Sequence, residues 1–362
     1  MRTVRVELRE RSYDILIGEG LLGNAGPRLR ELGLRGTGIV VSDTTVGKLY
    51  GPRVISSLKD AGFNAALYTM PAGEEYKNLD ETRKIYSEML KLGLERGSFA
   101  ISLGGGVVGD ITGFAAATFV RGIHCIQIPT SLLAQVDASV GGKVGVNLPQ
   151  GKNLIGSFYQ PRGVLIDPSV LTTLARRHLS SGFAEVIKHA VIRDAAHFDF
   201  LEKNFTRALS LDAPCLEKII GRSCEIKSEI VARDEREGGV RMTLNFGHTI
   251  GHALETVTGY RSYIHGEAVA IGMAHAAAIA ARCAFLSRED YHRIVRLIES
   301  FGLPVRMEGV SAADILAAMR QDKKMRDGQV NFVLPRRIGE VFVTDEVGED
   351  AVRAAIEQHS AD

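Results

Sequence analysis

The chain has 362 residues, of which 45% are hydrophobic and 24% are charged, and it contains no tryptophan. These values are typical of a globular protein, and the length predicts about two domains of roughly 100–200 residues each. Lysine and arginine total 44 against 43 for aspartate and glutamate, so a net charge of +1 provides no general attraction to nucleic acid or to an anionic membrane. Any binding site for an anion must therefore be local.

The N-terminus, MRTVRVELRER, alternates apolar and charged residues and lacks the apolar core of a signal peptide. The longest apolar stretch, residues 268–281, is shorter than the roughly 20 residues that cross a bilayer, and it predicts a buried helix. The four cysteines lie far apart without a CxxC pair, which favours reduced thiols over disulfides or a structural zinc site. We therefore expect a cytoplasmic protein with no membrane partner.

Residues 1–175 alternate short β-rich runs with stretches of helical periodicity. The runs are TGIVVSD, NAALYTMP, SFAISLGGG, IHCIQIPTS and GVLIDP. They are almost continuously apolar, as is expected of parallel strands that helices cover on both faces. The pattern predicts an α/β domain built on a parallel sheet.

Long helical patterns dominate from about residue 176 to the end, at residues 180–193, 214–233, 243–258, 266–285 and 290–301. Near the C-terminus, GQVNFVLPRRIGEVFVTD predicts a β-hairpin whose turn carries Arg336, Arg337 and Gly339. Because no biased linker separates the halves, the change in periodicity sets the boundary. We expect an α/β domain over residues 1–175, a mainly α-helical domain over residues 176–362, and a cleft between them.

Four glycines in ISLGGGVVGDITGF, Gly104, Gly105, Gly106 and Gly109, lie between a predicted strand and a predicted helix. Backbone NH groups in such a turn, together with the helix N-terminus, can face a phosphate. The segment HCIQIPTS, about 20 residues downstream, lacks the carboxylate that usually holds a ribose. The glycines therefore predict either a nucleotide site, with the ribose contact from an earlier strand end such as Asp43, or a tight packing turn.

A second polar segment, QIPTSLLAQVDASVGGKVGVNLPQGKNLIGSFYQP, combines glycines with Asp137, Lys143, Asn147, Lys152 and Asn153. Glycine allows close backbone approach, and lysine and asparagine donate hydrogen bonds to anionic oxygens. The segment predicts either an anion-binding loop or a long surface loop with solvated lysines.

The helical half carries two patterns that suit a metal. In SGFAEVIKHA, Glu185, Lys188 and His189 share one side of a helix. Glu185 and His189 could be metal ligands, or Glu185 and Lys188 could form a surface ion pair. In NFGHTIGHALE, His248 and His252 have the four-residue spacing of zinc ligands on a helix, but no glutamate follows His248 as it does in HExxH metalloproteases.

The segment YIHGEAVAIG adds His265 and Glu267 at the start of the apolar helix. Three histidines and Glu185 resemble the two-histidine, one-carboxylate set of catalytic zinc sites, which keeps a coordination position open. The same half also holds more polar and cationic groups than a zinc centre requires, and they suit a substrate with carboxylate and phosphate groups. These groups are Lys188, Lys227, Arg241, Asn245 and the run DKK at residues 322–324.

Taken together, the motifs resemble one known family. SLGGGVVGD, IPTSLLAQVDASVGGKVGVN, GKNLIGSFYQP, GFAEVIKHA, RMTLNFGHTIGHALE, HGEAVAIGM and DKK have the order and spacing of the 3-dehydroquinate synthases, from about residue 40 to residue 345. The resemblance implies a Rossmann-like NAD-binding domain followed by a helical metal- and substrate-binding domain, with the active site in the cleft between them. It also implies a homodimer, while the net charge of +1 predicts no nucleic-acid partner.

The resemblance also assigns residues by their position in the motifs. It gives zinc or cobalt to Glu185, His248 and His265. It gives the substrate to Arg121, Asp137, Lys143, Asn153, Lys188, Lys227, Arg241, Asn245, His252 and either Lys323 or Lys324, with Lys143, Lys188, Asn245 and His252 as the catalytic group and Arg121 reaching the neighbouring subunit. It gives NAD to Asp43, Gly73, Glu74, Lys77, Gly105, Gly106, Val107, Asp110, Thr130, Ser131, Lys152, Leu171, Thr172 and Thr173.

The function that the resemblance implies is a phosphate-eliminating lyase of the shikimate pathway. It would convert 3-deoxy-D-arabino-heptulosonate 7-phosphate to 3-dehydroquinate and phosphate by transient oxidation at C5 by NAD, elimination, re-reduction and aldol closure. Alternatives are another sugar-phosphate cyclase, such as an amino-dehydroquinate synthase, or a metal-dependent polyol dehydrogenase. Lys227, Arg241 and the DKK run favour a substrate that carries a carboxylate. A valiolone-type cyclase or a polyol dehydrogenase would not need these cationic residues.

Overall fold

The computed structural model describes residues 1–321 and 330–359, and the chain divides into two compact units. The first unit comprises Met1–Leu174 and Leu216–Ala232, and the second comprises Ala175–Cys215 and Arg233–Asp362. The sequence predicted one boundary at residues 175/176 and placed residues 216–232 in the helical half. The structure groups that segment with the α/β unit instead.

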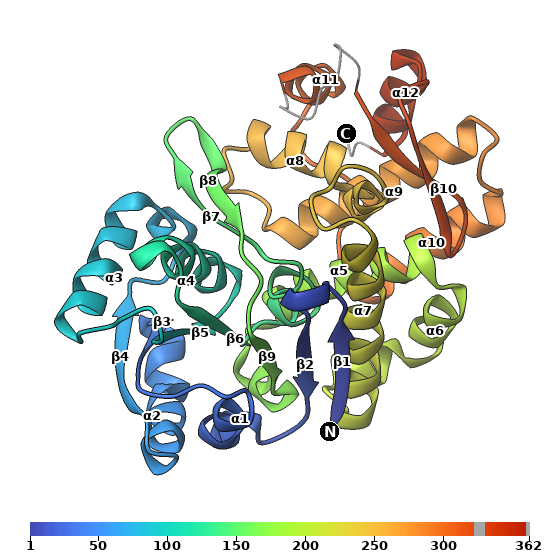
Figure 1. The fold of residues 1–362 in the computed structure, drawn as a ribbon. Coiled ribbons are helices and arrows are strands. Elements are labelled where there is room, and N and C mark those ends of the chain that lie inside the picture. The colour runs from blue at the N-terminus through green and yellow to red at the C-terminus, as the bar shows by residue number, and fades with distance from the viewer. Residues whose placement is uncertain (322–329, 360–362) are drawn as a thin grey trace. The chain divides into compact units, whose positions relative to one another are not determined.

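A seven-stranded sheet forms the centre of the first unit (Figure 1). Its strands, in spatial order, are β1 (Arg2–Val6), β2 (Tyr13–Ile17), β9 (Gly163–Ile166), β6 (His124–Pro129), β5 (Phe99–Gly104), β3 (Thr37–Asp43) and β4 (Asn64–Met70). The pair β1–β2 is antiparallel and every other pair is parallel. The five apolar runs of the sequence are thus confirmed as parallel strands, whereas β1 and β2 were not predicted.

Helices cover both faces of this sheet because its strands are apolar on both faces. Helices α1 (Ala25–Glu31) and α2 (Thr44–Asp60) contribute to the core on one face, and α3 (Leu79–Lys91) and α4 (Gly106–Thr118) to the core on the other. In β3, Ile39 and Val41 pack into the core with α3 and α4, while Val40 packs into the core with α1 and α2. This alternation follows from the two-residue repeat of a strand.

The polar segment after β6 is ordered secondary structure and not a long loop. It begins with a π-helical turn, η5 (Ala134–Ala138), and continues as an antiparallel hairpin of β7 (Lys143–Leu148) and β8 (Gly151–Phe158). Gly145 and Gly156 are partners across the hairpin, and a Cβ atom on Gly156 would lie 2.4 Å from the carbonyl oxygen of Val144. The glycines therefore let the two strands approach closely.

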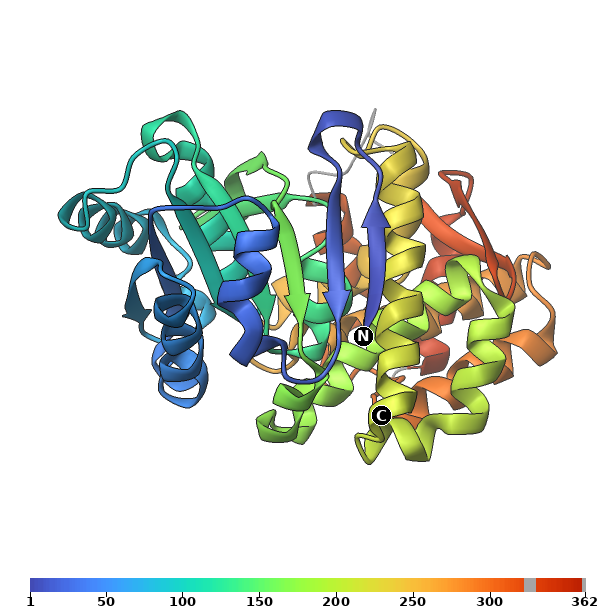
Figure 2. The same cartoon turned by 60° about the horizontal axis from the view of Figure 1, so that its bottom comes forward.

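Helix α7 (Ala213–Arg233) covers the edge of the sheet at β1, and Figures 1 and 2 both show the two elements side by side. The Arg2 guanidinium forms an ion pair with Glu225, and the N-terminal amine lies 3.5 Å from Glu217 Oε1. The Cys224 thiol donates to the carbonyl of Gln135 at 3.4 Å. These contacts explain why most of α7 belongs to the first unit, and the helix protects an edge strand that would otherwise be open to pairing.

The second unit is mainly helical, as the sequence predicted. Its elements are α5 (Arg176–Arg193), α6 (Ala195–Leu209), η7 (Val240–Asn245), α8 (His248–Val257), α9 (His265–Arg282), α10 (Arg288–Ser300), α11 (Ala312–Gln321), the hairpin of β10 (Phe332–Arg337) and β11 (Glu340–Thr344), and α12 (Glu349–His359). The predicted apolar helix is α9, and it is buried over most of its length. Helices α6, α11 and α12 were not predicted. The remaining short helical turns of the chain are η1 (Arg9–Arg11), η2 (Leu21–Asn24), η3 (Glu74–Tyr76), η4 (Phe119–Arg121) and η6 (Pro168–Thr173).

The helix predicted over residues 243–258 begins only at His248. Gly247 has a φ of 79°, and a Cβ atom there would lie 2.7 Å from the carbonyl oxygen of Val269 on α9. Only glycine adopts this left-handed conformation without cost while the backbone lies so close to a neighbouring helix. Gly247 thus separates the short helix η7 from α8 and sets where His248 begins its helix.

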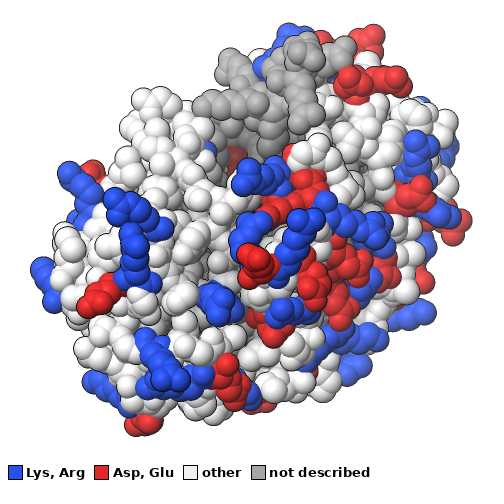
Figure 3. Space-filling view, viewed as in Figure 1, with Lys and Arg blue, Asp and Glu red and all other residues white. Residues whose placement is uncertain are grey.

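Charges of both signs are distributed over the described surface. On the face drawn in Figure 3, acidic and basic side chains are interspersed and separated by uncharged areas. None of the helices in residues 1–321 and 330–359 has the combined length and hydropathy of a membrane span.

All four cysteines are free thiols, and burial makes two of them unreactive. Burial raises the pKa of both Cys125 and Cys224 to about 12. Because the thiolate is the nucleophile, we expect iodoacetamide at pH 7.5 to leave both thiols intact in the folded protein and to modify both after unfolding in guanidinium. Peptide mass spectrometry measures this, and modification of the folded protein at the rate of the denatured one would contradict it.

Candidate active site

Most of the residues predicted to contact NAD follow the carboxyl ends of the parallel strands. Asp43 ends β3, and Thr130 and Ser131 follow β6. Gly105, Gly106 and Val107 follow β5, Gly73, Glu74 and Lys77 follow β4, and Leu171, Thr172 and Thr173 follow β9. Open α/β sheets bind their ligands at this edge. Lys152 lies on β8, which pairs with β7 and is not a strand of this sheet.

The glycine turn after β5 leads directly into α4, with Gly105 as the residue before the helix. The NH of Thr130 donates to the carbonyl of Gly104 at 2.9 Å, which joins the ends of β5 and β6. Asp43 has a structural role of its own, since its Oδ1 accepts hydrogen bonds from the NH groups of Thr45 and Val46 at the start of α2. The helix N-terminus at Gly105 is suited to a phosphate, and a ribose contact by Asp43 would use its other oxygen.

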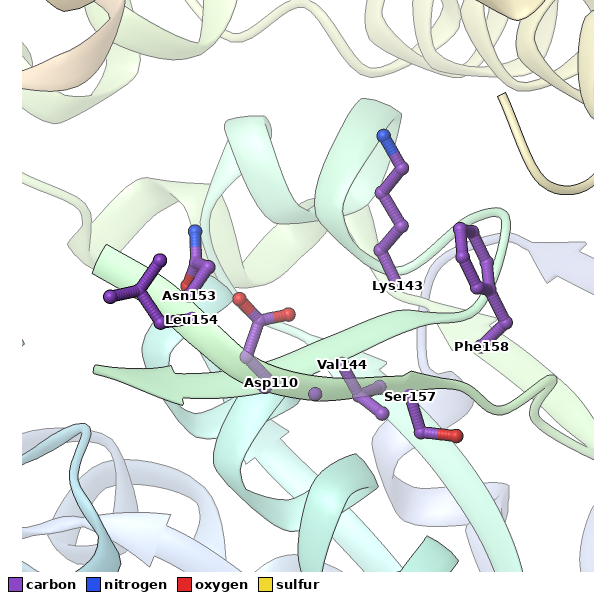
Figure 4. Close-up of a pocket in the computed structure, with 9 residues that line it drawn as sticks. Asp110, Lys143, Val144, Asn153, Leu154, Ser157 and Phe158 are labelled. Atoms are coloured by element: carbon purple, nitrogen blue, oxygen red, sulfur yellow. The ribbon is translucent and has the colours of Figure 1, made fainter. Parts of the chain in front are cut away.

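A cavity of about 340 Å³ brings together three of the predicted residues (Figure 4). Asp110 lies in the first turns of α4, Lys143 begins β7, and Asn153 lies on β8, and Figure 4 shows their side chains on the same side of the hairpin. The other lining residues are Val144, Gly145, Leu154, Gly156, Ser157 and Phe158. A predicted NAD contact, Asp110, thus shares a cavity with two predicted substrate contacts.

Lys77 joins these groups from the segment between β4 and α3. Its Nζ lies 2.5 Å from Asp110 Oδ2 and 2.6 Å from Asn153 Oδ1, and only 5% of its side chain is exposed. Burial raises the pKa of Asp110, and the charge and hydrogen bond of Lys77 lower it in part. Lys77 was assigned to NAD, but its ammonium holds Asp110 and Asn153 in place.

Asn153 has a left-handed backbone conformation. Its φ is 55°, in a region that asparagine adopts more readily than most residues other than glycine. Its NH donates to Asn147 Oδ1 at 2.9 Å, and Asn147 Nδ2 donates to Glu74 Oε1 at 2.8 Å. Asn147 therefore fixes the backbone of Asn153, and Lys77 fixes its side-chain amide.

Two further substrate candidates of the first unit form a pair. Lys227, on α7, donates from Nζ to both the carbonyl oxygen and Oδ1 of Asp137, each at 2.6 Å. Asp137 belongs to the π-helical turn η5, an element that is frequent at functional sites. Arg121, by contrast, is exposed at the end of η4 and is not part of the cavity lining.

In the second unit, Glu185, His248 and His265 can hold a metal ion. Glu185 lies on α5, while His248 and His265 are the first residues of α8 and α9. Nε2 of His248 and Nε2 of His265 lie 3.7 Å and 3.6 Å from Glu185 Oε1. Tetrahedral ligands with bonds of about 2.0–2.1 Å lie about 3.3–3.5 Å from one another. The three side chains therefore fit zinc or cobalt after only a small contraction.

Hydrogen-bond partners orient the ligand atoms. His248 Nδ1 lies 3.1 Å from the carbonyl oxygen of Phe246, which can only accept, so Nδ1 carries the hydrogen and Nε2 faces Glu185. The second oxygen of Glu185 forms an ion pair with Lys188. Glu185 and Lys188 are almost fully buried. The predicted ion pair between them therefore exists, but it does not lie at the surface. The geometry matches a metal site whose ligands are fixed by outer contacts.

The electrostatics of this cluster favour a cation. Burial lowers the pKa of His265, but its contacts with Glu185 and Glu255 outweigh that effect and raise the pKa to about 10. The negative charges of Glu185 and Glu255, which stabilise the proton on His265, would also stabilise a divalent ion in place of that proton. The donor set and its charge thus both suit a metal.

His252 lies outside this triad. It groups with Glu255 and His265 in a second set that shares His265, and its ring centroid is 5.2 Å from that of His248. The four-residue spacing of His248 and His252 alone would have made them the ligand pair, whereas the structure groups His248 with a histidine from a different helix. The contact of His252 with the substrate stays a prediction.

The remaining polar candidates of the second unit lie on η7. Arg241 is only 2% exposed, and its guanidinium donates to the carbonyl of Glu235. Asn245 Nδ2 donates to Glu237 Oε1 at 2.9 Å. Lys323 and Lys324 lie outside the described residues, so the choice between them stays open.

Two groups that the sequence did not single out lie beside candidate residues in the structure. Glu255 contacts His265, and Asn147, noted only as part of a polar segment, supports Asn153. Glu255 carried a signal, since it lies seven residues after His248 and so on the same side of the helix. A glutamate at such a position is usually solvated, so spacing alone did not distinguish it.

Known proteins resemble this chain over most of its length. Residues 67–181 match the model of the 3-dehydroquinate synthase N-terminal family, and residues 182–325 match that of the C-terminal family. A 3-dehydroquinate synthase of Desulforamulus reducens is 49% identical over 99% of this chain and 100% of the relative. A 2-epi-5-epi-valiolone synthase from Streptomyces hygroscopicus, solved with NAD+ and Zn2+, covers 99% of each chain with a TM-score of 0.89 and 30% identity. A 2-deoxy-scyllo-inosose synthase, solved with carbaglucose-6-phosphate, NAD+ and Co2+, covers 99% of this chain and 100% of its own with a TM-score of 0.89 and 26% identity. The chain belongs to the 3-dehydroquinate synthase family.

Proposed function

We propose that this protein converts 3-deoxy-D-arabino-heptulosonate 7-phosphate to 3-dehydroquinate and phosphate. It is an NAD- and divalent-metal-dependent lyase of the shikimate pathway that acts on a small phosphorylated sugar acid. The observation that carries the proposal is the buried triad of Glu185, His248 and His265 in a chain of this family, since its geometry fits a catalytic metal.

When bound, NAD would supply reversible hydride transfer at C5, and a divalent metal would supply Lewis-acid stabilisation of negative charge on the C5 oxygen. The chain supplies the site for each. The glycine turn at Gly105 and the ends of β3, β4, β6 and β9 would hold the nucleotide. Glu185, His248 and His265 would hold the metal, with Lys188 fixing the second oxygen of Glu185.

Charged and polar groups would bind the two ends of the substrate. Lys143, Asn153, Asn245, His252 and Arg121 would contact the phosphate, while Lys227 and Arg241 would contact the carboxylate. Binding energy at both ends would position the reacting carbons, which is how an enzyme uses remote contacts to accelerate a step. The phosphate itself would accept the C6 proton as it leaves, and His252 would orient a water molecule in that transfer.

Loss of Lys143 should weaken substrate binding. We expect Lys143→Met to raise KM about 10- to 100-fold, because a charge-assisted hydrogen bond contributes about 1.5–3 kcal/mol. Lys48→Met, which removes an exposed lysine of α2, is the matched control and should leave KM unchanged. Steady-state phosphate release measures both variants, and an equal KM in all three proteins would remove Lys143 from the phosphate site.

Identification of the product tests the proposed function against an amino-dehydroquinate synthase. NMR of the reaction with 3-deoxy-D-arabino-heptulosonate 7-phosphate should show 3-dehydroquinate. Turnover only of the amino analogue of this substrate would contradict the proposal.

We also propose a homodimer located in the cytoplasm. Support for the location comes from the four free thiols, which suit a reducing compartment. Support for the dimer comes from Arg121, which is exposed and does not line the cavity of its own chain. Light scattering should give twice the mass of the chain, and a monomer at micromolar concentration would contradict the dimer.

A further inference from the structure

Glu255 is a buried carboxylate to which neither the motifs nor the proposed reaction gives a role. It lies on α8, seven residues after His248 and three after His252, so that all three share one side of the helix. The residue is only 5% exposed. Burying a carboxylate is unfavourable unless a donor or a cation faces it, so this position calls for a partner.

That partner is the imidazole of His265. Glu255 Oε2 lies 3.5 Å from Nδ1 of His265, while Glu185 Oε1 lies 3.6 Å from Nε2 of the same ring. A carboxylate therefore faces each nitrogen of His265. An imidazole that binds a metal through one nitrogen is neutral and carries its single hydrogen on the other nitrogen, so with a metal bound the two carboxylates cannot have the same role.

The side chains offer two overlapping ligand sets that share His265. One set is Glu185, His248 and His265, and the other is His252, Glu255 and His265. The first set uses Nε2 of His265 and the second uses Nδ1. A metal in one set therefore requires the hydrogen of His265 on the opposite nitrogen.

The partner of His248 favours the first set. The carbonyl oxygen of Phe246 keeps the hydrogen of His248 on Nδ1, so Nε2 of that ring is the ligand atom on the side of Glu185. Glu255 can hold the hydrogen of His265 on Nδ1 in the same way. Both rings would then present Nε2 to one metal ion.

We propose that Glu255 is a positioning residue that accepts the Nδ1–H of His265 and thereby directs Nε2 of His265 to the metal. The inference deepens the proposed function and rests on its metal dependence. Carboxylate–histidine–metal arrangements of this kind fix the tautomer and the ring orientation and increase the basicity of the ligand. By this assignment Glu255 is not itself a metal ligand.

The test measures zinc affinity by competition with a chelator, in the absence of NAD and substrate. We expect Glu255→Gln to bind zinc about 10- to 100-fold more weakly than the parent protein, because outer partners of ligands have effects of this size. We expect Glu255→Asp to bind zinc more tightly than Glu255→Gln, because it restores a negative charge near Nδ1. The cobalt-loaded proteins give a second readout, since a displaced His265 changes the visible absorption of the ion.

His252→Gln separates positioning from ligation. If Glu255 only positions His265, His252→Gln leaves zinc affinity unchanged, while Glu255→Gln lowers it. Equal zinc affinity in Glu255→Gln and the parent protein would overturn the proposal. A loss of affinity in His252→Gln equal to that in Glu255→Gln would overturn it in favour of the second ligand set.

Two controls distinguish a wrong role for Glu255 from misfolding of the variant and from a protein that binds no zinc. Circular dichroism of the metal-free variants should match that of the parent protein, and if Glu255→Gln fails to fold, Glu255→Asp and the cobalt spectrum carry the test. A parent protein that binds no zinc would overturn the proposed metal dependence itself, and the role of Glu255 with it.

Discussion

Replacing Glu185 with glutamine should remove the metal and the activity together. Both histidine Nε2 atoms lie within 3.7 Å of Glu185 Oε1, so this oxygen is shared by both ligand contacts. The substitution keeps the volume of the side chain and removes its charge. We expect zinc affinity to fall by more than about 100-fold, which is a larger effect than loss of an outer partner has. Metal analysis after gel filtration and phosphate release measure the two losses.

The matched control is Glu202→Gln. Glu202 lies on α6 of the same unit and forms an ion pair with Arg293, so Glu202→Gln also removes one carboxylate charge but should release no metal. An active, metal-free Glu185→Gln protein would show that Glu185 is not a ligand. Loss of zinc from both variants would point to a general effect of charge on the unit.

Replacing Lys77 with methionine should substantially lower the free energy of unfolding. The buried ammonium of Lys77 faces both Asp110 and Asn153, and removing one member of a buried ion pair costs about 3–5 kcal/mol when the other charge is left behind. We expect the lower half of this range, because 22% of the Asp110 side chain is exposed. Urea unfolding measures the change. Lys84→Met, which breaks the pair with Glu81 from a 62% exposed lysine, should cost less than about 1 kcal/mol.

The loss in Lys77→Met should depend on pH and on Asp110. Burial already raises the pKa of Asp110, and removing Lys77 raises it further, so the folded state holds the Asp110 proton more tightly than the unfolded state does. Stability then falls as pH rises above the unfolded pKa, and the destabilisation should be larger at pH 8 than at pH 5. Adding Asp110→Asn should recover part of the loss. Equal destabilisation at both pH values would contradict an unpaired Asp110.

The strands and helices that the sequence predicted are those with a strong local pattern. β3, β5 and β6 are nearly continuous apolar runs, and α9 is apolar from Ala268 to Ala281 apart from His275. β1 is short and contains two arginines and a threonine among its five residues, and it is stabilised by the neighbouring strand β2 and by α7, which is distant in sequence. The glycines of the β7–β8 hairpin are needed because its two strands approach each other closely. A local sequence pattern could not reveal this hairpin.

The candidate site shows the same division between local and distant contacts. Glycine placement after β5 predicted the turn into α4 because the strand and the helix are adjacent in sequence. Residue spacing could not select His265 over His252 as the partner of His248, because His265 begins a different helix. The resemblance to a family supplied that choice. Neither source predicted Glu255 against His265 or Lys77 between Asp110 and Asn153, since each contact depends on side-chain packing in three dimensions.

The function proposed for this chain requires that it eliminate phosphate through transient oxidation by a recycled NAD. The most direct test adds 3-deoxy-D-arabino-heptulosonate 7-phosphate to metal-stripped protein, with and without zinc and a trace of NAD+, and follows phosphate release and NADH absorbance together. We predict zinc-dependent release of many phosphates per NAD+ with no lasting NADH. Accumulation of NADH without phosphate would contradict the claim and indicate a dehydrogenase.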